Sequence, residues 1–564
     1  MDQRHRSHAS PTLTDIPDAE RRAGVLVPLF SIRSSRGWGI GEFPDLGPFA
    51  QLLATAGQTV LQLLPLGEVG SAETSPYGAL TAFGLDPTYL ALDDVEDFVA
   101  LGAPAALGDA GVTELERVRA AGRVDYLAVR RLKQQALRAA FGHFRDGPLA
   151  AGGAPARALA DFVEQQRAWL PDYALFRALR DEHREAGWQT WAAPLRERRP
   201  EALADAAARL KDEVRFYEYV QWQCDIQLGA ARRAVNGAGM LLKGDLPFMV
   251  SGDSADVWAH QDQFRTDVRL GAPPDQFSPD GQDWGLPVYD WEVMERDGLA
   301  WIRQRAARAA AHYDMFRVDH VVGFYRQFVI EPGEQGELTP AEEGDQIVLG
   351  ERVLSAMLQA AGEVEARRPA NGSTTALTIV AEDLGVVPPY VRRSLTGLGI
   401  PGTKVQRWEK TWEKDDGRSF LDPAHYAPLS LCTSGTHDTS TLASWYEDEL
   451  DQTERHALFA IPALLPHARV AGPRFTPEVH GALLEGLYGA GSALCILPIQ
   501  DLLGSRDRIN TPSTVSTDNW VYRLPLTVDQ MRRDGGIAVL LDRARRLGQK
   551  HGRAAAAPAR AATS

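Results

Sequence analysis

Eight short apolar runs, separated by helical stretches, constrain the fold more than any other feature of this chain. They occupy residues 25–30, 59–67, 240–248, 314–321, 377–385, 403–408, 429–438 and 493–501. Apolar runs that alternate with helices indicate a parallel sheet whose faces are covered by those helices. Eight of them favour an α/β fold of the (β/α)8 TIM-barrel type, with an open parallel sheet as the alternative.

Two regions interrupt this alternation. Residues from 99 to 238 are rich in alanine, arginine, leucine and glutamate, in the pattern of successive amphipathic helices. They are too many for one barrel crossover, so we expect an inserted helical subdomain. Residues 331–346 are polar and are expected to form a loop before a helix near 347–367. The predicted organisation is a disordered tail at 1–22, a barrel from 23–98 and 239–550, the helical insertion at 99–238, and a disordered tail at 551–564.

Charge and cysteine content narrow the possible partners. The chain has 60 basic and 75 acidic residues, a formal net charge of −15. An acidic surface does not attract phosphate backbones or anionic lipid, so we expect neither a nucleic-acid nor a membrane partner. Three widely spaced cysteines, Cys224, Cys432 and Cys495, cannot build a disulfide framework, which suits a reducing compartment. No signal-peptide pattern or spanning apolar run is found, so we expect a cytoplasmic enzyme.

Acidic residues stand at the ends of four of the apolar runs. Asp245 follows MLLKG, Asp319 follows DMFRV, Glu382 follows LTIVA and Asp438 follows CTSGTH. In a barrel the carboxyl ends of the strands converge on one mouth, where active sites lie. A single acid at a strand end is usually a cap or a loop hydrogen-bonder. Four such acids predict a catalytic site.

Cleavage of a glycosidic bond with retention of the anomeric configuration requires a pair of carboxyl groups. One carboxylate attacks the anomeric carbon and a protonated carboxyl delivers a proton to the leaving oxygen. Arg317 lies on the same side of the strand as Asp319, where it favours the ionised form, although a plain salt bridge is the alternative. Glu382 is expected to have a raised pKa through partial desolvation and a neighbouring acid, Asp383.

Aromatic residues cluster in polar, glycine-rich and proline-rich loops near these acids. Such rings stack on the apolar faces of sugars, although each tryptophan taken alone is more often a core anchor. They are Tyr77, Trp258, Trp284, Tyr289, Trp291 and Trp520. Neither a metal-binding histidine motif nor a phosphate-binding loop of the GxxxxGK[ST] type is present. The aromatic loops therefore favour a carbohydrate ligand.

A set of ordered motifs resembles the amylomaltase family of 4-α-glucanotransferases, glycoside hydrolase family 77. They run from about residue 24 to residue 524 and include GWGIGEFPDLG, LQLLPLG, SPYGALTAFGLDPTYL, KGDLPFMVSGDSADVWA, GQDWGLPVYDW, FRVDHVVGF, IVAEDLGVVPPYV, GIPGTKV, SGTHDTSTLASW and RINTPSTVSTDNWVYRLP. The resemblance implies a (β/α)8 barrel with helical insertions and a double-displacement mechanism without metal or organic cofactor.

The resemblance also assigns roles by motif. FRVDH implies that Asp319 is the nucleophile with Arg317 as its partner, and AEDLG implies that Glu382 is the acid/base. THD implies that Asp438 stabilises the transition state. The residues expected to bind substrate are Arg317, His437, Tyr77, Asp245, Trp284, Trp258, His320 and Asn519.

The expected activity is transfer of α-1,4-glucan segments between maltodextrin donors and acceptors. A hydrolase with the same site is one alternative, and a non-catalytic glucan-binding protein, which would be expected to lose a carboxylate, is another. Val322 in DHVVG differs from many bacterial members of the family. PLFSIRSS and DHVVGF resemble the plant cytosolic disproportionating branch, which uses maltose and a large glucan acceptor.

Overall fold

An eight-stranded, all-parallel sheet forms the centre of the computed structural model, which describes residues 21–553 apart from 275–280, 334, 369–377, 413–416, 418, 513 and 515. In sheet order the strands are β10 (Gly402–Val405), β11 (Ser430–Thr433), β12 (Leu494–Pro498), β1 (Arg22–Leu26), β2 (Val60–Gln62), β3 (Leu241–Leu246), β6 (Met315–Val318) and β9 (Ile379–Ala381). Each of the eight apolar runs contributes one strand. Strands of a parallel sheet are buried on both faces, so they appear in the sequence as continuous apolar runs.

The two end strands of this order, β9 and β10, meet and close the sheet. The Ala381 amide donates to the Pro401 carbonyl at 2.8 Å, and the Thr403 hydroxyl donates to the Ala381 carbonyl at 2.8 Å. On the opposite side of the barrel, β1 pairs with β12 and places Val25 beside Leu497. The predicted (β/α)8 barrel is therefore confirmed, and the open-sheet alternative is wrong.

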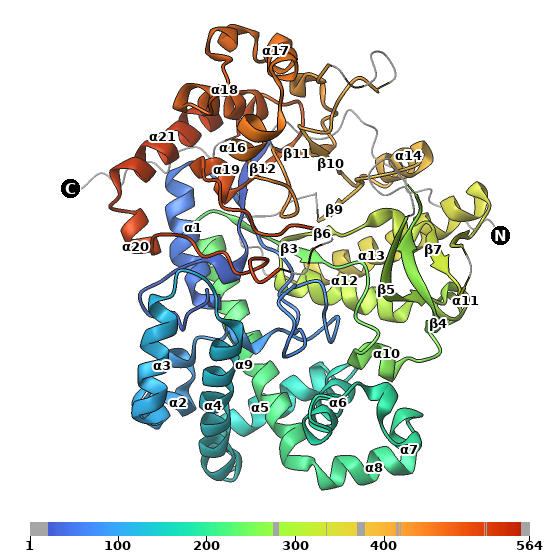
Figure 1. Ribbon diagram of the computed structural model, residues 1–564. Coiled ribbons are helices and arrows are strands. Elements are labelled where there is room, and N and C mark those ends of the chain that lie inside the picture. Colours follow the sequence, from blue (N-terminus) through green and yellow to red (C-terminus); the bar gives the residue numbers. More distant parts are fainter. Residues whose placement is uncertain are drawn as a thin grey trace, which may run out of the picture.

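Helices surround the barrel and connect its strands (Figure 1). They are α1 (Leu46–Thr55), α11 (Trp291–Arg296), α12 (Ala300–His312), α13 (Glu343–Glu365), α14 (Pro389–Gly397), α16 (Leu442–Ser444), α17 (Gln452–Ala460), α18 (Pro477–Tyr488), α19 (Ile499–Leu503), α20 (Val528–Met531) and α21 (Gly535–Lys550). Within the described ranges, no helix combines the length and the apolar character that crossing a membrane requires.

A helical subdomain lies between β2 and β3 and occupies the lower part of Figure 1. Its helices are α2 (Glu96–Ala100), α3 (Gly108–Ala120), α4 (Tyr126–Phe144), α5 (Ala154–Gln165), α6 (Leu170–Glu182), α7 (Ala193–Arg196), α8 (Pro200–Arg209) and α9 (Lys211–Gly237). The long helix α9 packs against both α6 and α1, so it joins the subdomain to the barrel. A buried ion pair of 2.7 Å between Lys133 of α4 and Glu42, near the start of α1, is a second connection.

A second, antiparallel sheet was not predicted from the sequence. Its order is β5 (Gln282–Tyr289), β4 (Phe264–Ala272), β7 (Gln327–Ile330) and β8 (Glu337–Thr339). The expected loop at 331–346 is wrong in part, because it contains β8 and the start of α13 at Glu343. The three residues of β8 form an edge strand with little burial, so they lack the apolar alternation by which a strand is found.

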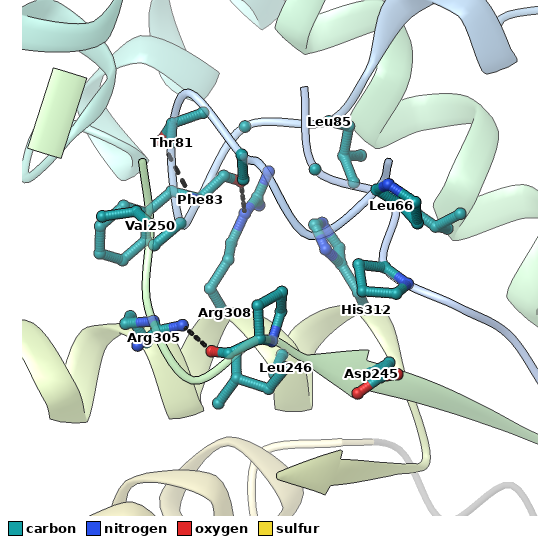
Figure 2. A pocket seen from close by; sticks show the side chains of 18 of the residues that line it. Leu66, Thr81, Phe83, Leu85, Asp245, Leu246, Val250, Arg305, Arg308 and His312 are labelled. Carbon is teal, nitrogen blue, oxygen red and sulfur yellow. Dashed lines mark hydrogen bonds between the residues drawn. The ribbon is translucent and has the colours of Figure 1, made fainter. Parts of the chain in front are cut away.

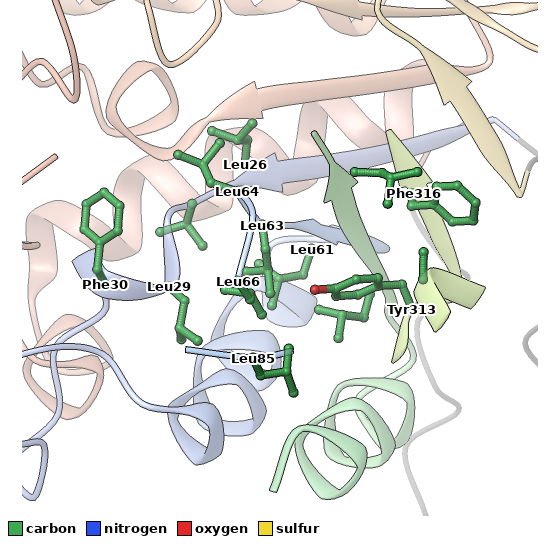
Figure 3. Close-up of a cluster of buried hydrophobic side chains, with 14 of the residues drawn as sticks. Leu26, Leu29, Phe30, Leu61, Leu63, Leu64, Leu66, Leu85, Tyr313 and Phe316 are labelled. Atoms are coloured by element: carbon green, nitrogen blue, oxygen red, sulfur yellow. The ribbon is translucent and has the colours of Figure 1, made fainter. Parts of the chain in front are cut away.

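The hydrophobic core fills the barrel and continues between the barrel and its helices. Figure 3 shows part of it, where Leu26 of β1, Leu61 of β2 and Phe316 of β6 lie among buried leucines from the following loops. Because these strands carry apolar side chains on both faces, each packs inward and outward at once. The core therefore fixes the heights at which the strands end, which is where the acidic residues begin.

The C-terminal segment holds the last strand in place through a buried arginine. Arg553 lies within the predicted tail at 551–564, whose residues 554–564 are outside the described part of the chain. It is 1% exposed, and its guanidinium donates to backbone carbonyls, including that of Tyr488 at 2.7 Å and that of Ala493 at 3.0 Å. The expectation of a disordered tail is therefore wrong for residue 553. Of the other predicted tail, residues 1–20 lie outside the described part, while Arg22 begins β1.

We expect Arg553→Ala to lower the free energy of unfolding by about 2–4 kcal/mol, because several buried carbonyls would lose their donor. Urea denaturation followed by circular dichroism measures this. Arg546→Ala is the control: that side chain is 64% exposed and pairs with Asp542, so its loss should change stability by no more than about 0.5 kcal/mol. Equal midpoints for the two variants would contradict a stabilising role for Arg553.

Candidate active site

Four acidic side chains meet at the carboxyl end of the barrel. Asp245 is the fifth residue of β3, Asp319 directly follows β6, and Glu382 directly follows β9. Asp438 lies five residues beyond β11. The register places Asp245 opposite Arg317 and Val318 opposite Ala381, so the strands β3, β6 and β9 present their polar ends at similar heights.

The Arg317 guanidinium lies at the centre of this group. One terminal nitrogen contacts both carboxylate oxygens of Asp245, at 2.8 and 2.6 Å. The other contacts Asp319 Oδ1 at 2.7 Å and Glu382 Oε2 at 3.5 Å. The side chain is only 12% exposed, so these charges act on one another with little screening by water. A single cation thus holds three carboxyl groups together.

Asp319 and Glu382 lie close to each other. Their contacts with the same guanidinium nitrogen limit the gap between those oxygens to about 6 Å, a range that includes the roughly 5–5.5 Å of retaining pairs. Both side chains remain partly open, at 22% and 19% exposure. A substrate can therefore reach both carboxyl groups from the mouth of the barrel.

The environment of Glu382 suits a proton donor. Burial raises its pKa to about 7; Arg317 opposes this rise, and the nearby Asp319 adds to it. The His320 amide donates to Glu382 Oε2 at 2.7 Å and fixes the carboxyl group. The expected contribution of Asp383 is wrong, because this side chain accepts from the Thr403 amide at 2.6 Å and from Arg392 at 3.0 Å.

Asp319 has a different set of neighbours. Burial raises its pKa above the ordinary value, and the Arg317 guanidinium at 2.7 Å opposes this rise. The Phe248 amide also approaches Oδ2 at 3.4 Å. Asp319 lies closer to the Arg317 cation than Glu382 does, so its ionised form is the better stabilised of the two.

Asp438 and the adjacent His437 form an ion pair at the mouth of the barrel. His437 Nε2 lies 3.3 Å from Asp438 Oδ2. Although burial opposes ionisation of both groups, their attraction leaves the pKa of Asp438 lowered to about 2 and the pKa of His437 raised. Asn510 donates to Asp438 Oδ1 at 2.6 Å. The residue missed by sequence reasoning is Asn510, although it lies in the last family-like motif, RINTPSTV.

Aromatic rings line one wall of the site. Tyr77 donates its hydroxyl to Asp245 Oδ2 at 2.9 Å, and its ring stacks on His437 with centroids 5.0 Å apart. The Trp520 ring lies 6.0 Å from Tyr77 and 5.6 Å from His437. These contacts hold the three rings together beside the carboxylates.

Trp284 and His320 lie on the other side of the mouth. The two rings meet edge to face with centroids 4.9 Å apart, and Trp284 is half-buried on β5. His320 has a left-handed backbone, with φ of 41°. That conformation costs free energy for a non-glycine residue, and it occurs where the backbone amide turns toward Glu382.

Two of the predicted substrate-binding residues have structural roles instead. Trp258 is fully buried, its indole nitrogen donates to the Leu195 carbonyl at 3.0 Å, and its ring packs beside Trp191. The expectation that Trp258 contacts substrate is therefore wrong. Asn519 accepts from the Thr511 amide at 3.1 Å and donates to nearby carbonyls, so it shapes the loop that follows Asn510.

A small hollow borders this site at Asp245 (Figure 2). Arg305 donates to the Phe248 carbonyl at 3.1 Å, and Arg308 donates to the Phe83 carbonyl at 3.3 Å. These arginines hold the loops that carry the wall residues. The converging carboxyl groups lie at the mouth, so we place the reaction there and not in the hollow.

Known proteins are similar to this chain in sequence and in architecture. A family model described as 4-alpha-glucanotransferase matches residues 27–527. The 4-alpha-glucanotransferase of Chlamydia pneumoniae is 32% identical over 515 residues, 90% of this chain and 92% of that protein. That of Thermus thermophilus is 34% identical and covers 86% of this chain and 92% of that protein. The structure of amylomaltase from Streptococcus agalactiae in complex with acarbose is 24% identical, with a TM-score of 0.76, and covers 95% of this chain and all of that one.

We expect Arg317→Met to lower the free energy of unfolding at pH 7 by about 3–5 kcal/mol, because three buried carboxylates would lose their common cation. Burial already raises the pKa values of Asp319 and Glu382, and without Arg317 these values rise further, so ionisation opposes folding more strongly and protonation relieves the penalty. The loss relative to wild type should therefore shrink as the pH is lowered toward 5, which urea titrations at both pH values measure. Arg269→Met, at an exposed pair with Asp283, should change stability little at either pH. A loss that does not depend on pH would contradict this account.

Proposed function

We propose the reaction of this chain from its family, since the chain belongs to the 4-alpha-glucanotransferase family, glycoside hydrolase family 77. It transfers segments of α-1,4-glucan from a donor chain to an acceptor chain. The observation that supports a double displacement at this site is the contact of both Asp319 and Glu382 with one Arg317 nitrogen. Two carboxyl groups at this spacing fit a retaining reaction.

In the proposed first step, Asp319 attacks the anomeric carbon of the donor. Arg317, at 2.7 Å, opposes the effect of burial and favours the ionised form of Asp319 that a nucleophile requires. Glu382 protonates the glycosidic oxygen as the bond breaks, which a pKa near 7 permits at neutral and lower pH. The shortened glucan leaves, and a glycosyl group remains bound to Asp319.

In the second step, Glu382 acts as a base. The departure of its proton leaves a carboxylate that accepts the proton of the acceptor's 4-hydroxyl. That hydroxyl attacks the anomeric carbon from the side that the first glucan left, and the bond to Asp319 breaks. Two inversions give net retention of the α configuration. The His320 amide remains a donor to Glu382 and helps to stabilise this carboxylate.

Asp438 is proposed to stabilise the transition state. Its low pKa, about 2, keeps it ionised throughout the working pH range. Asn510 and His437 hold its two oxygens, so the carboxylate does not have to reorganise when the sugar ring flattens. Its bonds to sugar hydroxyls are expected to strengthen in that state, which lowers the barrier.

The aromatic walls are proposed to orient the donor and acceptor maltodextrins. The surface formed by Tyr77, His437 and Trp520 suits the apolar face of a sugar ring beside the carboxylates. Trp284 and His320 flank the opposite side.

We place the enzyme in the cytoplasm, which three free cysteines support. A hydrolase would use the same carboxyl groups, and the family is what favours transfer over hydrolysis.

Incubation with maltotriose tests the proposed function. We expect glucose and maltodextrins longer than maltotriose to appear together, because the glycosyl group passes to a second sugar and not to water. Chromatography of the products over time measures both. Accumulation of glucose and maltose without longer chains would show that the chain is a hydrolase. Asp319→Asn is the control and should form neither set of products, since an amide cannot act as the anionic nucleophile.

A second experiment separates the two duties of Glu382. An α-maltosyl fluoride donor needs little protonation, so Glu382→Gln should still form the glycosyl-enzyme and then stall. Azide needs no deprotonation and should restore turnover to within about a hundredfold of wild type, given that general acid–base catalysis contributes roughly 10²–10⁴-fold. The expected product is the α-glycosyl azide, identified by NMR. A β-configured azide would mean direct displacement and would reject the covalent intermediate on Asp319.

A further inference from the structure

Two tryptophans lie exposed on a hairpin beside the mouth of the barrel. Trp408 and Trp412 are 42% and 52% exposed, and among the described residues they are the tryptophans that face solvent. Single exposed apolar residues are common, but large aromatic side chains are usually buried for their hydrophobic contribution. Two of them four positions apart, with the 40% exposed Leu421 on the paired segment, form an apolar patch that folding leaves uncovered.

This hairpin is firmly attached to the body of the protein. Lys410 is bridged to Phe420, and the Leu421 amide donates to the Glu409 carbonyl at 2.8 Å. The buried Phe420 ring meets Trp445 at 6.0 Å, and Lys410 Nζ lies 3.1 Å from a Glu454 carboxylate oxygen. The residues Lys410 and Phe420, which pair beside the exposed rings, are therefore fixed to the body of the protein.

The Trp412 ring is supported from below. Gly417 has φ of +75°, and a Cβ added there would come within 2.4 Å of the indole, so the glycine backbone lies directly against the ring. Lys410 Nζ lies 6.0 Å from its centroid. Lys410 Nζ also lies 4.8 Å from the centroid of the Phe420 ring, and Trp408 lies two residues before Lys410, in the turn that follows β10. The ring is thus held in place while half of its surface stays open.

The hairpin is continuous with the active site. It begins directly after β10, which lies between β9, the strand that leads to Glu382, and β11, the strand that leads to Asp438 (Figure 1). Arg407 joins the two regions, because it donates to the Ser434 carbonyl at 3.1 Å and to the Ser440 hydroxyl at 2.9 Å. Ser434 and Ser440 flank the His437–Asp438 pair. A long ligand that is bound at the carboxylates and extends over the end of β10 would therefore meet the hairpin.

We propose that Trp408 and Trp412 form a platform that binds α-glucan chains outside the catalytic mouth. This rests on the proposed function for the identity of the ligand. Flat, rigid rings at most about 14 Å apart along the backbone suit several successive sugar units, whose apolar faces stack on aromatic side chains. The neutral indoles suit an uncharged polymer. The platform favours long glucans over maltotriose, because a trisaccharide held at the carboxylates ends before the hairpin.

Affinity electrophoresis in gels that contain soluble starch tests this platform. The measurement uses the full chain carrying Asp319→Asn, so that the starch is not altered during the run. Adding Trp408→Ala and Trp412→Ala should weaken retardation by about tenfold or more, since both aromatic faces are lost. Phe at both positions should restore most of the retardation. The matched control is Leu127→Ala with Val539→Ala, two exposed apolar residues, and it should migrate like the Asp319→Asn parent.

Kinetics with the active enzyme locate the platform relative to the catalytic mouth. In the double alanine variant, KM for a long maltodextrin should rise several-fold, while kcat/KM for maltotriose stays within about twofold. Unchanged retardation by starch would overturn the proposal. A parallel loss of maltotriose activity, with circular dichroism unchanged, would also overturn it, because the rings would then belong to the catalytic mouth. Failure of the wild-type chain to disproportionate maltotriose rejects the proposed function separately, since retardation by starch is measured without turnover.

Discussion

The ion-pair group around Arg317 is the interaction on which the site depends. Three carboxyl groups of like charge would repel one another at this distance and would become protonated in a buried setting. The guanidinium opposes this protonation, and it does so unequally: it contacts Asp245 with one nitrogen, and its other nitrogen lies 2.7 Å from Asp319 and 3.5 Å from Glu382. That inequality favours the anionic form of Asp319 more than that of Glu382, as the proposed roles of the two acids require.

The barrel provides the geometry that this group needs. Adjacent parallel strands are about 4.8 Å apart, so residues at the ends of β3, β6 and β9 come within reach of one long side chain. Register decides which residues these are, since a shift of one position would turn Asp319 or Arg317 to the opposite face. The core beneath the mouth is filled by buried leucines and phenylalanines and holds that register. The stability of the barrel and the alignment of the catalytic groups therefore have the same origin.

The sequence was enough to predict the barrel and the acids because both give strong local signals. The barrel strands are buried on both faces and appear as apolar runs, and the acids stand where those runs end. The antiparallel sheet escaped prediction because strands such as β8 are short and largely exposed. Trp258 was misassigned because it lies two positions from Asp256 and from His260, whereas its ring packs in the core beside Trp191. Asn510 was missed because a loop brings it to Asp438 across 72 positions, a contact that no local pattern records.

The pairing of β1 with β12 has a consequence for how the chain is made. Gly24 lies beside Ile496, so the first strand to leave the ribosome waits for a partner synthesised about 470 residues later. At roughly 5–20 residues per second this interval lasts from about half a minute to a minute and a half. During that time β1 can pair with β2 on one side only, and its other edge offers unpaired backbone groups to any extended segment nearby. The growing protein therefore passes through a long-lived open sheet, and its need for protection against misassociation ends only when β12 and Arg553 have been translated.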